Sequence, residues 1–480
     1  MNSLSKSLIH YCSVVVILLL GNSNSCYGQE EQLTQKIDNY LQSKFEKGNI
    51  PGFTVAVVKK DKILLSKGYG KSSNHQDLTA NTPFAIASLS KAFTALAIMQ
   101  LVESGKIILD VPISMYYPSF PLLTSKITVR KLLNQTSGLS DKFFPEMQYN
   151  QQPQDLDASI ERLRGRKFDI EPVEKFHYHN PNYQILARIV ELVSKQSFSE
   201  YLRENICEPL GMKYTKNISL TNYFYTSNGG NLAEGYNFIF GISRKMKELN
   251  WFVEGSAGMT STADDMAKWL MLFLNKGKSN GASLLNAENI QLMLTPSKKS
   301  GSSYGMGWSI NDERIATHTG ILWTYQSEQM LMLEKGYGVV ILFNSGLNAF
   351  QDYGSFSQGI LEIINGNTPG VGIQLSIYLE LLMVLLMIVT FYFGIKSIKE
   401  KRKWQNKMVL RLTLNVLLRL FPLIIFILIP QIMIFISGRV LSWERVFWMM
   451  PSIIIWLAIQ STFNIIIIFL RLKPIVISKY

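Results

Sequence analysis

A serine and a lysine three residues apart are the pair in this chain whose spacing most directly suggests covalent chemistry. Ser88 and Lys91 open the mostly apolar segment 88–102, which favours a helix. Positions i and i+3 lie on one helix face, so the hydroxyl and the amine are expected to meet. The positive end of the helix favours negative charge on the serine oxygen and proton loss from a nearby, partly desolvated amine. The pair predicts an activated nucleophile, although helix capping is the ordinary role of a serine at this position.

Three segments downstream could complete such a site. Segment 176–183 reads FHYHNPNY and precedes an apolar helical stretch, segment 255–259 reads GSAGM, and segment 318–320 reads HTG on a predicted strand. His177 and His179 have a spacing found in metal sites, but the sequence offers no evident third ligand or carboxylate partner. We therefore expect no metal and no cofactor.

The order and spacing of these segments resemble the serine β-lactamase-like hydrolases. This superfamily includes class C β-lactamases, D-alanyl-D-alanine carboxypeptidases, D-aminopeptidases and related esterases. The resemblance runs from Leu33 to Asn348, and segments 127–139 and 304–308 also fit it. It implies an α+β fold of the β-lactamase/transpeptidase type, in which an antiparallel sheet is flanked by helices and accompanied by a helical subdomain.

The resemblance implies a role for each matching polar residue. Ser88 would be the acylated nucleophile, and Lys91 would help to activate it. Tyr178, in the position of a Tyr-x-Asn motif, would carry a proton. Asn180 would orient Lys91 or an amide of the substrate. Acyl transfer needs such a nucleophile and base, whatever the family.

The third motif would bind substrate and stabilise the oxyanion. His318, Thr319 and Gly320 match the Lys-Thr-Gly element of the family in its His-x-Gly form. The resemblance implies that His318 is catalytic and that Thr319 and Gly320 contact the substrate. The backbone N–H groups of Ser88 and Ile321 would form the oxyanion hole.

Two departures from the family pattern affect the expected substrate. Residues 321–326 read ILWTYQ, where small residues are usual, and His179 fills the middle of the Tyr-x-Asn motif. Both changes are expected to narrow or reshape the acyl pocket, which argues against efficient hydrolysis of β-lactam drugs. The sequence also shows no acidic deacylating residue of the class A kind.

Strand-like segments at both ends of the hydrolase region predict one sheet closed by distant parts of the chain. The predicted strands are 53–58, 63–65, 317–333 and 338–343, and the predicted helices between them include 182–193 and 262–274. Thr262 followed by Asp265 fits a capping box. Strands at both ends with helices between them indicate an α+β domain with a helical insertion.

The composition changes after residue 364. A linker, residues 365–374, is followed by three apolar segments, 375–395, 412–436 and 446–470, each long enough to span a bilayer. Gln460 and Asn464 inside the third segment are interpreted as polar contacts between helices.

The flanking charges and the N-terminus predict the same topology. Residues 1–28 read as a signal peptide cleaved after Gly28, with lipid attachment at Cys26 as the alternative. The loop between the first two spans is rich in lysine and arginine, which places it in the cytoplasm. The hydrolase domain, residues 29–364, is then extracytoplasmic, either periplasmic or on the cell surface.

The charge balance argues against a nucleic-acid partner. The chain carries a formal net charge of +13, and most of that excess lies in the residues that flank the three spans. No basic stripe with interleaved aromatic residues is present, so the membrane is the expected partner and nucleic acid is not.

The layout as a whole indicates a substrate class. An exported domain of this type with three following spans resembles the membrane-bound peptidases that mature nonribosomal peptide prodrugs. We expect a membrane-anchored serine peptidase, amidase or esterase acting on peptide-like or D-acyl small molecules or envelope substrates. The alternatives are a β-lactamase, a D-alanyl esterase of the cell envelope, and a penicillin-binding sensor or pseudo-enzyme that acylates without turnover. A transporter is disfavoured because three spans without repeats are too few. The sequence does not determine the oligomeric state.

Overall fold

The structure is a computed structural model of the chain. It describes residues 28–72, 76–121, 126–141, 151–164, 175–297, 301–370, 375–400, 409–437 and 441–477. The predicted signal peptide up to residue 27, including Cys26, and residues 401–408 of the predicted cytoplasmic loop lie outside the described residues.

A six-stranded antiparallel sheet forms the centre of the domain that precedes the apolar helices, with strand order β10-β11-β12-β13-β1-β2. Its strands are β1 (Gly52–Lys59), β2 (Lys62–Gly70), β10 (Ser309–Ile310), β11 (Ile315–Ile321), β12 (Gln326–Met332) and β13 (Tyr337–Phe343). β1 and β2 contain the predicted strands 53–58 and 63–65 and form a hairpin, and β1 pairs with β13 so that Val57 lies opposite Val339. The prediction that distant ends of the sequence close one sheet is confirmed.

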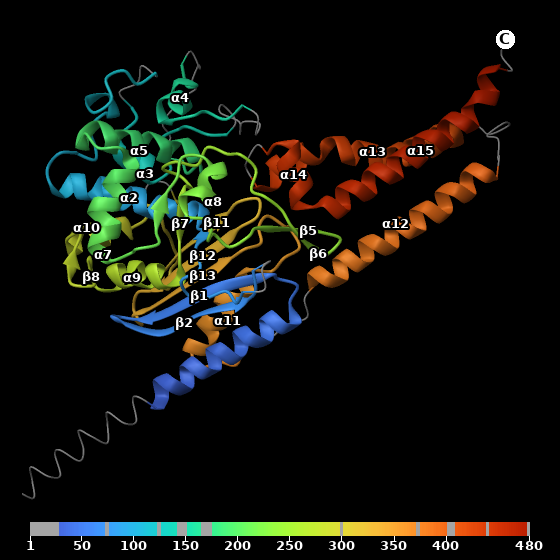
Figure 1. Ribbon diagram of the computed structural model, residues 1–480. Helices are drawn as coiled ribbons and strands as arrows, with labels where there is room; N and C mark the ends of the chain where they lie inside the picture. Colours follow the sequence, from blue (N-terminus) through green and yellow to red (C-terminus); the bar gives the residue numbers. More distant parts are fainter. Residues whose placement is uncertain are drawn as a thin grey trace, which may run out of the picture.

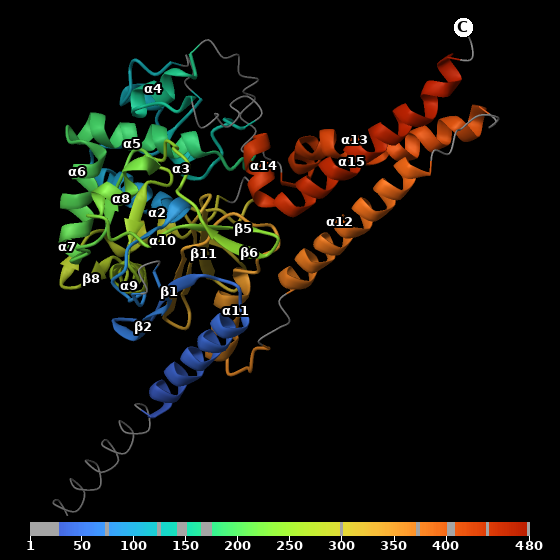
Figure 2. The same ribbon diagram turned by 45° about the vertical axis from the view of Figure 1, so that its right-hand side comes forward.

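Both faces of this sheet are covered, which explains why β1 is apolar along its whole length. Ala56 and Val58 belong to the core beneath the helical subdomain, whereas Val55 and Val57 pack on the other face. Alternating side chains of a strand point to opposite faces, so a strand buried on both sides must be apolar throughout. The helix over residues 28–47 and α11 (Gly354–Ile364) lie together on that second face (Figures 1 and 2).

The first face carries the helices that position the candidate site. The longer ones are α2 (Ser90–Glu103), α5 (Asn180–Ser194), α9 (Ala263–Leu274) and α10 (Ala287–Met293). Shorter elements are η1 (Ala87–Leu89), η2 (Ile113–Met115), α3 (Val129–Leu133), α4 (Leu156–Glu161), α6 (Phe198–Leu202), η4 (Arg203–Cys207), α7 (Glu208–Leu210), η5 (Thr221–Tyr223) and α8 (Phe224–Ser227). Three small sheets are made by β3 (Phe84–Ala85), β7 (Met259–Ser261) and β4 (Lys216–Asn217), by β5 (Tyr236–Ile239) and β6 (Ile242–Lys245), and by β8 (Lys278–Ser279) and β9 (Ala282–Ser283).

Helix α9 joins the sheet to α2. Its Trp269 ring stacks on Phe93 of α2 with a centroid separation of 3.7 Å. Thr262 caps α9 by accepting a hydrogen bond from the Asp265 N–H at 3.1 Å, as predicted. The reciprocal half of the predicted capping box is wrong, because the Asp265 carboxylate accepts hydrogen bonds from Tyr214 N at 2.7 Å and Thr215 Oγ1 at 3.0 Å. That carboxylate holds a separate chain segment instead of closing its own helix.

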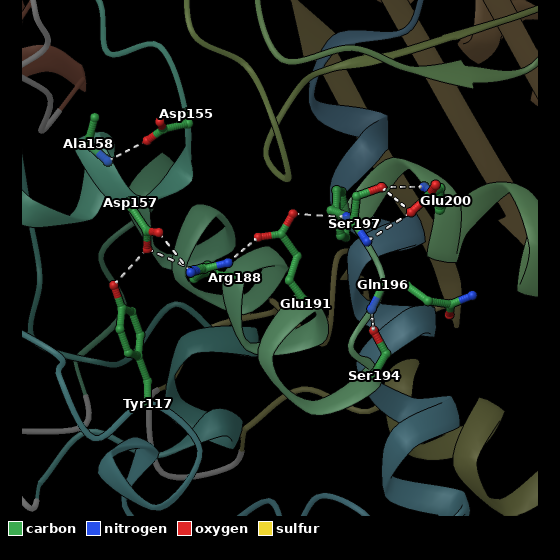
Figure 3. A network of polar contacts seen from close by, with 11 residues as sticks. Tyr117, Asp155, Asp157, Ala158, Arg188, Glu191, Ser194, Gln196, Ser197 and Glu200 are labelled. Carbon is green, nitrogen blue, oxygen red and sulfur yellow. Dashed lines mark hydrogen bonds and ion pairs between the residues drawn. The ribbon is translucent and has the colours of Figure 1, made fainter.

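An ion-pair network fixes α5, the helix that begins at Asn180 (Figure 3). The Arg188 guanidinium donates to both oxygens of Asp157 on α4 at 2.8 and 2.7 Å, and to Glu191 at 2.8 Å. Tyr117 donates to Asp157 at 3.1 Å, and Glu191 accepts from the backbone N–H of Phe198 at 3.0 Å. The network therefore links α4, α5 and the start of α6.

Among the described residues after the domain that carries the six-stranded sheet, four helices follow: α12 (Leu375–Lys399), α13 (Val409–Ser437), α14 (Trp443–Met449) and α15 (Pro451–Ile477). Three of them, α12, α13 and α15, are long and apolar enough to cross a membrane. The predicted third segment is divided, because α14 ends at Met449 and Pro451 opens α15. Polar contacts join the long helices: Thr390 donates to Gln460 at 2.8 Å, and Arg419 donates to Asn464 at 3.1 Å.

The short helix α14 lies against the hydrolase domain, as both views show (Figures 1 and 2). The Ala349 N–H, in the loop after β13, donates to the Met449 carbonyl at 2.8 Å. The start of α12 approaches the hairpin of β5 and β6, because a Cβ at Gly241 would lie 3.3 Å from Glu380 Cβ. The two parts of the chain are therefore in direct contact.

Replacing Arg188 tests the network around α5. Arg188→Met leaves the carboxylate of Asp157 without its paired cation, so we expect a loss of about 1–2 kcal/mol of stability and a fall of about 2–4 °C in the melting temperature. Arg203→Met is the matched control, because Arg203 pairs with Glu204 and Glu208 at an exposed position. Thermal melting of the purified protein measures both. Equal melting temperatures for the two variants would show that the network contributes nothing.

Candidate active site

Ser88 lies in a tight turn directly before α2. Ala87 has a φ of +47°, a left-handed conformation that costs energy for a residue with a Cβ. β11 approaches this turn closely: a Cβ at Gly320 would lie 2.5 Å from the Ile86 carbonyl oxygen and 3.0 Å from the Ala87 Cβ. Only glycine permits that approach, which brings the neighbouring residues Thr319 and Ile321 to the same cleft as Ser88.

Two proton-carrying groups contact the Ser88 hydroxyl. The Lys91 amine donates to Ser88 Oγ at 3.0 Å, and the Tyr178 hydroxyl donates to the same oxygen at 3.0 Å. Lys91 is fully buried, and it also donates to the Ser256 carbonyl at 2.8 Å. Its nitrogen lies 4.9 Å from the centre of the Tyr178 ring. The predicted Ser88–Lys91 contact is present, and Tyr178 joins it from a segment 90 residues away.

His318 is held as a neutral side chain. Its Nδ1 lies 2.7 Å from the Thr319 carbonyl oxygen, so Nδ1 carries the proton. Nε2 then accepts from the Tyr304 hydroxyl at 3.1 Å. Burial, followed by the positive charge of Lys91, lowers the pKa of His318 to about 3. Burial also raises the pKa of Tyr304 well above its usual range, so Tyr304 remains a protonated donor.

Asn180 begins α5 and lines the same cleft as Ser88. Its Oδ1 is buried and has no hydrogen-bond partner among the described residues. The structure therefore gives no hydrogen bond from Lys91 to Asn180, and the Lys91 contacts it does give lead to Ser88 and Ser256. Of the two predicted roles for Asn180, contact with an amide of the substrate is the one that fits an unoccupied acceptor.

The His179 side chain does not form part of the pocket wall, so of the two expected effects, narrowing and reshaping, only reshaping from behind the wall stays a prediction. Its side chain is fully buried, with Nδ1 2.8 Å from Asp141 Oδ1, and it is not among the described residues that line the cleft. Its backbone N–H donates to Gln135 Oε1 at 3.0 Å, which fixes the chain next to Tyr178. Asp141 is the carboxylate partner that the sequence did not reveal. The described residues contain no cluster of three or more side chains suited to a metal ion.

A cleft of about 530 Å³ surrounds Ser88. The domain that carries the six-stranded sheet contributes most of its lining, and the part of the chain that follows it, from α12 to α15, contributes four residues. The first group includes Ser88, Phe176, Tyr178, Asn180, Trp251, Phe252, Ser256, Tyr304, Thr317, His318, Thr319, Ile321, Leu322 and Leu347, and the second consists of Met433, Leu441, Arg445 and Met449. A cleft of this volume accommodates a drug-sized ligand.

Three groups in or near the site were not predicted from the sequence. They are the Tyr304 hydroxyl, the Ser256 carbonyl and the Arg445 side chain. Segments 255–259 and 304–308 fitted the resemblance but suggested no role for a particular atom. Arg445 lies between two apolar segments, where its charge indicated topology only.

The part of the chain that contains Ser88 and the six-stranded sheet is similar to known proteins. The Beta-lactamase family model matches residues 33–354. Protein flp from Staphylococcus aureus (strain MW2) is 31% identical over 318 residues, which are 65% of this chain and 63% of that protein. This chain thus spans less than two thirds of the length of that relative.

Two examples of solved structures with the same fold are a penicillin-binding protein homologue and an amidase. The octameric penicillin-binding protein homologue from Pyrococcus abyssi has a TM-score of 0.59 and 24% identity, covering 70% of this chain and 78% of that chain. The D-amino acid amidase from Ochrobactrum anthropi SV3, complexed with D-phenylalanine, has a TM-score of 0.58 and 23% identity, covering 70% of this chain and 99% of that chain. The predicted fold class, an antiparallel sheet flanked by helices with three further apolar helices, is confirmed.

The neutral state of His318 predicts a specific acid sensitivity. The folded pKa of about 3 lies below the ordinary value of 6.5, so between these limits the unfolded chain binds a proton that the folded protein does not. Acidification therefore destabilises the fold, by about 2 kcal/mol at pH 5. We expect His318→Gln to lose less stability than the unmodified protein between pH 7 and pH 5.

Melting temperatures recorded from pH 5 to pH 8 for both proteins measure this difference. Burial raises the pKa of Glu248 to about 7, so Glu248 changes stability with pH in the opposite direction in both proteins. The comparison between the two proteins cancels that effect. If the melting temperatures of the unmodified protein and of His318→Gln change in parallel with pH, His318 is not held neutral by the fold.

Proposed function

This chain belongs to the beta-lactamase family of serine hydrolases, and from that membership we propose that it is a membrane-anchored serine hydrolase that acts through a Ser88 acyl-enzyme. The observation that carries the proposal is the position of Ser88 Oγ, 3.0 Å from both Lys91 Nζ and Tyr178 OH. A nucleophile in contact with two groups that exchange protons, at the wall of a cleft, is suited to acyl transfer.

The reaction follows from these contacts. The Ser88 oxygen attacks the carbonyl carbon of an amide or ester, and its proton passes to the deprotonated Tyr178 or Lys91. The tetrahedral intermediate breaks the bond to the leaving amine or alcohol, which takes up that proton. Water then attacks the acyl-enzyme, gives one proton through the same base to Ser88, and releases a carboxylic acid. The N–H groups of Ser88 and Ile321 would stabilise the oxyanion in both steps.

We assign substrate recognition to the groups that do not exchange this proton. Asn180 Oδ1 is a buried acceptor at the cleft and suits an amide N–H of the substrate. Thr319 and Gly320 lie on β11 beside the Ser88 turn, where an acyl chain can pair with the edge of the strand. The D-amino acid amidase with the same fold supports amides of D-configured amino acids as the class to test first.

The same proposal includes the location of the enzyme. The domain over residues 29–364 would lie outside the cytoplasm after removal of residues 1–28, with spans close to 375–395, 412–436 and 446–470. The basic residues between α12 and α13 support a cytoplasmic loop there. Because α14 touches the hydrolase domain, the cleft would open at the outer surface of the membrane.

A second candidate is a penicillin-binding sensor that acylates without turnover. It is favoured by the lining of the cleft, in which no described residue is acidic and the bulky Ile321 and Leu322 follow the glycine of β11. Without a carboxylate, activation of the deacylating water would depend on Tyr178 and Lys91 alone. The lifetime of the acyl-enzyme separates the two candidates.

Labelling with a neutral fluorophosphonate tests the nucleophile. We expect one covalent adduct by intact mass on the unmodified protein and none on Ser88→Ala, because Ser88 lies at the cleft with both Lys91 and Tyr178 in contact with its hydroxyl. Ser303→Ala is the control, since Ser303 is exposed and should keep the adduct. An adduct that survives in Ser88→Ala would contradict the proposal. When an acyl donor replaces the fluorophosphonate, an acyl-enzyme that persists for hours would favour the sensor candidate.

The proton carrier is tested by Tyr178→Phe. The variant keeps the ring over Lys91 and loses only the hydroxyl that contacts Ser88. We expect the rate of Ser88 labelling to fall by about 10²–10⁴-fold while the melting temperature is nearly unchanged. Labelling reactions quenched at successive times measure this rate. A rate equal to that of the unmodified protein would exclude Tyr178 from proton transfer.

A further inference from the structure

The membrane-associated part of the chain forms one wall of the cleft around Ser88. Met433 lies near the end of α13, Leu441 lies in the connection to α14, and Arg445 and Met449 belong to α14. The hydrogen bond from Ala349 N to the Met449 carbonyl, 2.8 Å long, holds α14 beside Leu347 of the same cleft. A substrate in the cleft would therefore touch residues from both parts of the chain.

Arg445 is the source of charge in this cleft. Among the described residues that line it, only Arg445 carries a formal charge at neutral pH. His318 stands where the family element has a lysine, but it is buried and its pKa of about 3 keeps it uncharged. Lys91 lies behind Ser88, fully buried, with its amine on Ser88 and Ser256. An anionic group on a ligand would find its counter-charge at Arg445.

The surroundings of Arg445 hold the guanidinium in place. It lies 5.5 Å from the centre of the Trp323 ring, and Trp323 meets Trp251 edge-on at 6.1 Å. The backbone N–H of Trp323 donates to the buried Glu248 carboxylate at 3.0 Å, and Thr324 donates to it twice, at 2.9 and 2.5 Å. Burial raises the pKa of this carboxylate, and the positive charge of Arg445 acts on it in the opposite direction with a smaller effect. A guanidinium has five N–H donors, so an arginine above an aromatic ring that already interacts with one carboxylate can still bind an oxyanion of a ligand.

From this arrangement, and resting on the proposed serine hydrolase function, we infer that Arg445 determines specificity by binding an anionic group of the substrate, a carboxylate or a phosphate, next to an apolar part that contacts Met433, Leu441 and Met449. The membrane-associated part then selects the substrate in addition to anchoring the enzyme. Ser88 and its two proton carriers would act on the bond, and Arg445 would choose which molecules are held for that reaction.

A pair of aryl esters that differ only in charge tests this inference. The probes are the 3-carboxyphenyl ester of N-phenylacetylglycine and the same ester with the carboxylate capped as a methyl ester. For the full-length protein in detergent or nanodiscs, we expect kcat/KM to favour the carboxylate. In Arg445→Gln the ratio of the two kcat/KM values should fall about 10–100-fold, mainly through KM, and Arg445→Lys should restore part of it.

Two controls separate a charge effect from a folding defect. Arg411→Gln removes an exposed arginine near the opposite end of α13 and should leave the ratio unchanged. In the unmodified protein, added salt should lower kcat/KM for the carboxylate ester more than for the capped ester, without any variant. The inference would be overturned if the unmodified protein showed no higher kcat/KM for the carboxylate ester, whether both esters react or neither does. It would also be overturned if Arg445→Gln left the ratio of the two kcat/KM values unchanged. If fluorophosphonate does not label Ser88 in the unmodified protein, the proposed function itself is overturned.

Discussion

A lysine amine buried beside a serine hydroxyl is the constraint on which the hydrolase domain depends. A buried amine must be hydrogen-bonded, and Lys91 finds its partners in Ser88 and the Ser256 carbonyl. The segment that carries Ser256 is fastened to α2 by Thr94, which donates to the Gly255 carbonyl at 2.6 Å, and by Ser90, which accepts from Met259 N at 2.9 Å. Gly307 approaches the backbone of the first turn of α2, and Gly320 approaches the turn at Ile86 and Ala87 that precedes it. The site is therefore built by close backbone approach as much as by side chains.

The sequence predicts the local part of this arrangement and misses the long-range part. The spacing of Ser88 and Lys91 predicted their contact, and the contact is present because the helical turn η1, which carries Ser88, runs directly into α2. The hairpin of β1 and β2 and the Thr262 cap of α9 are local in the same way. The contact of Tyr178 with Ser88 required the family resemblance, because it joins segments 90 residues apart.

Contacts set by tertiary packing left no signal in the sequence. Nothing near His179 indicates Asp141 as its partner, and nothing near His318 indicates Tyr304. The charge state of His318 also depends on burial, which becomes known only when β11 is placed against the Ser88 turn. The third apolar segment looked continuous because hydropathy averages over a window, whereas the break at Pro451 depends on one residue.

The break at Pro451 brings the C-terminal helices to the cleft around Ser88. A single uninterrupted helix would carry Arg445 and Met449 along its own axis, but the turn before Pro451 lets α14 lie against the hydrolase domain. Arg445 then meets Trp323, the third residue after Gly320, and Gly320 lies beside the turn that carries Ser88. The bulky 321–326 segment, which departs from the family pattern, provides the surface on which this arginine rests. The same departure that argues against efficient β-lactam hydrolysis thus gives the cleft a cation from another part of the chain, in place of the charge that a neutral His318 does not supply.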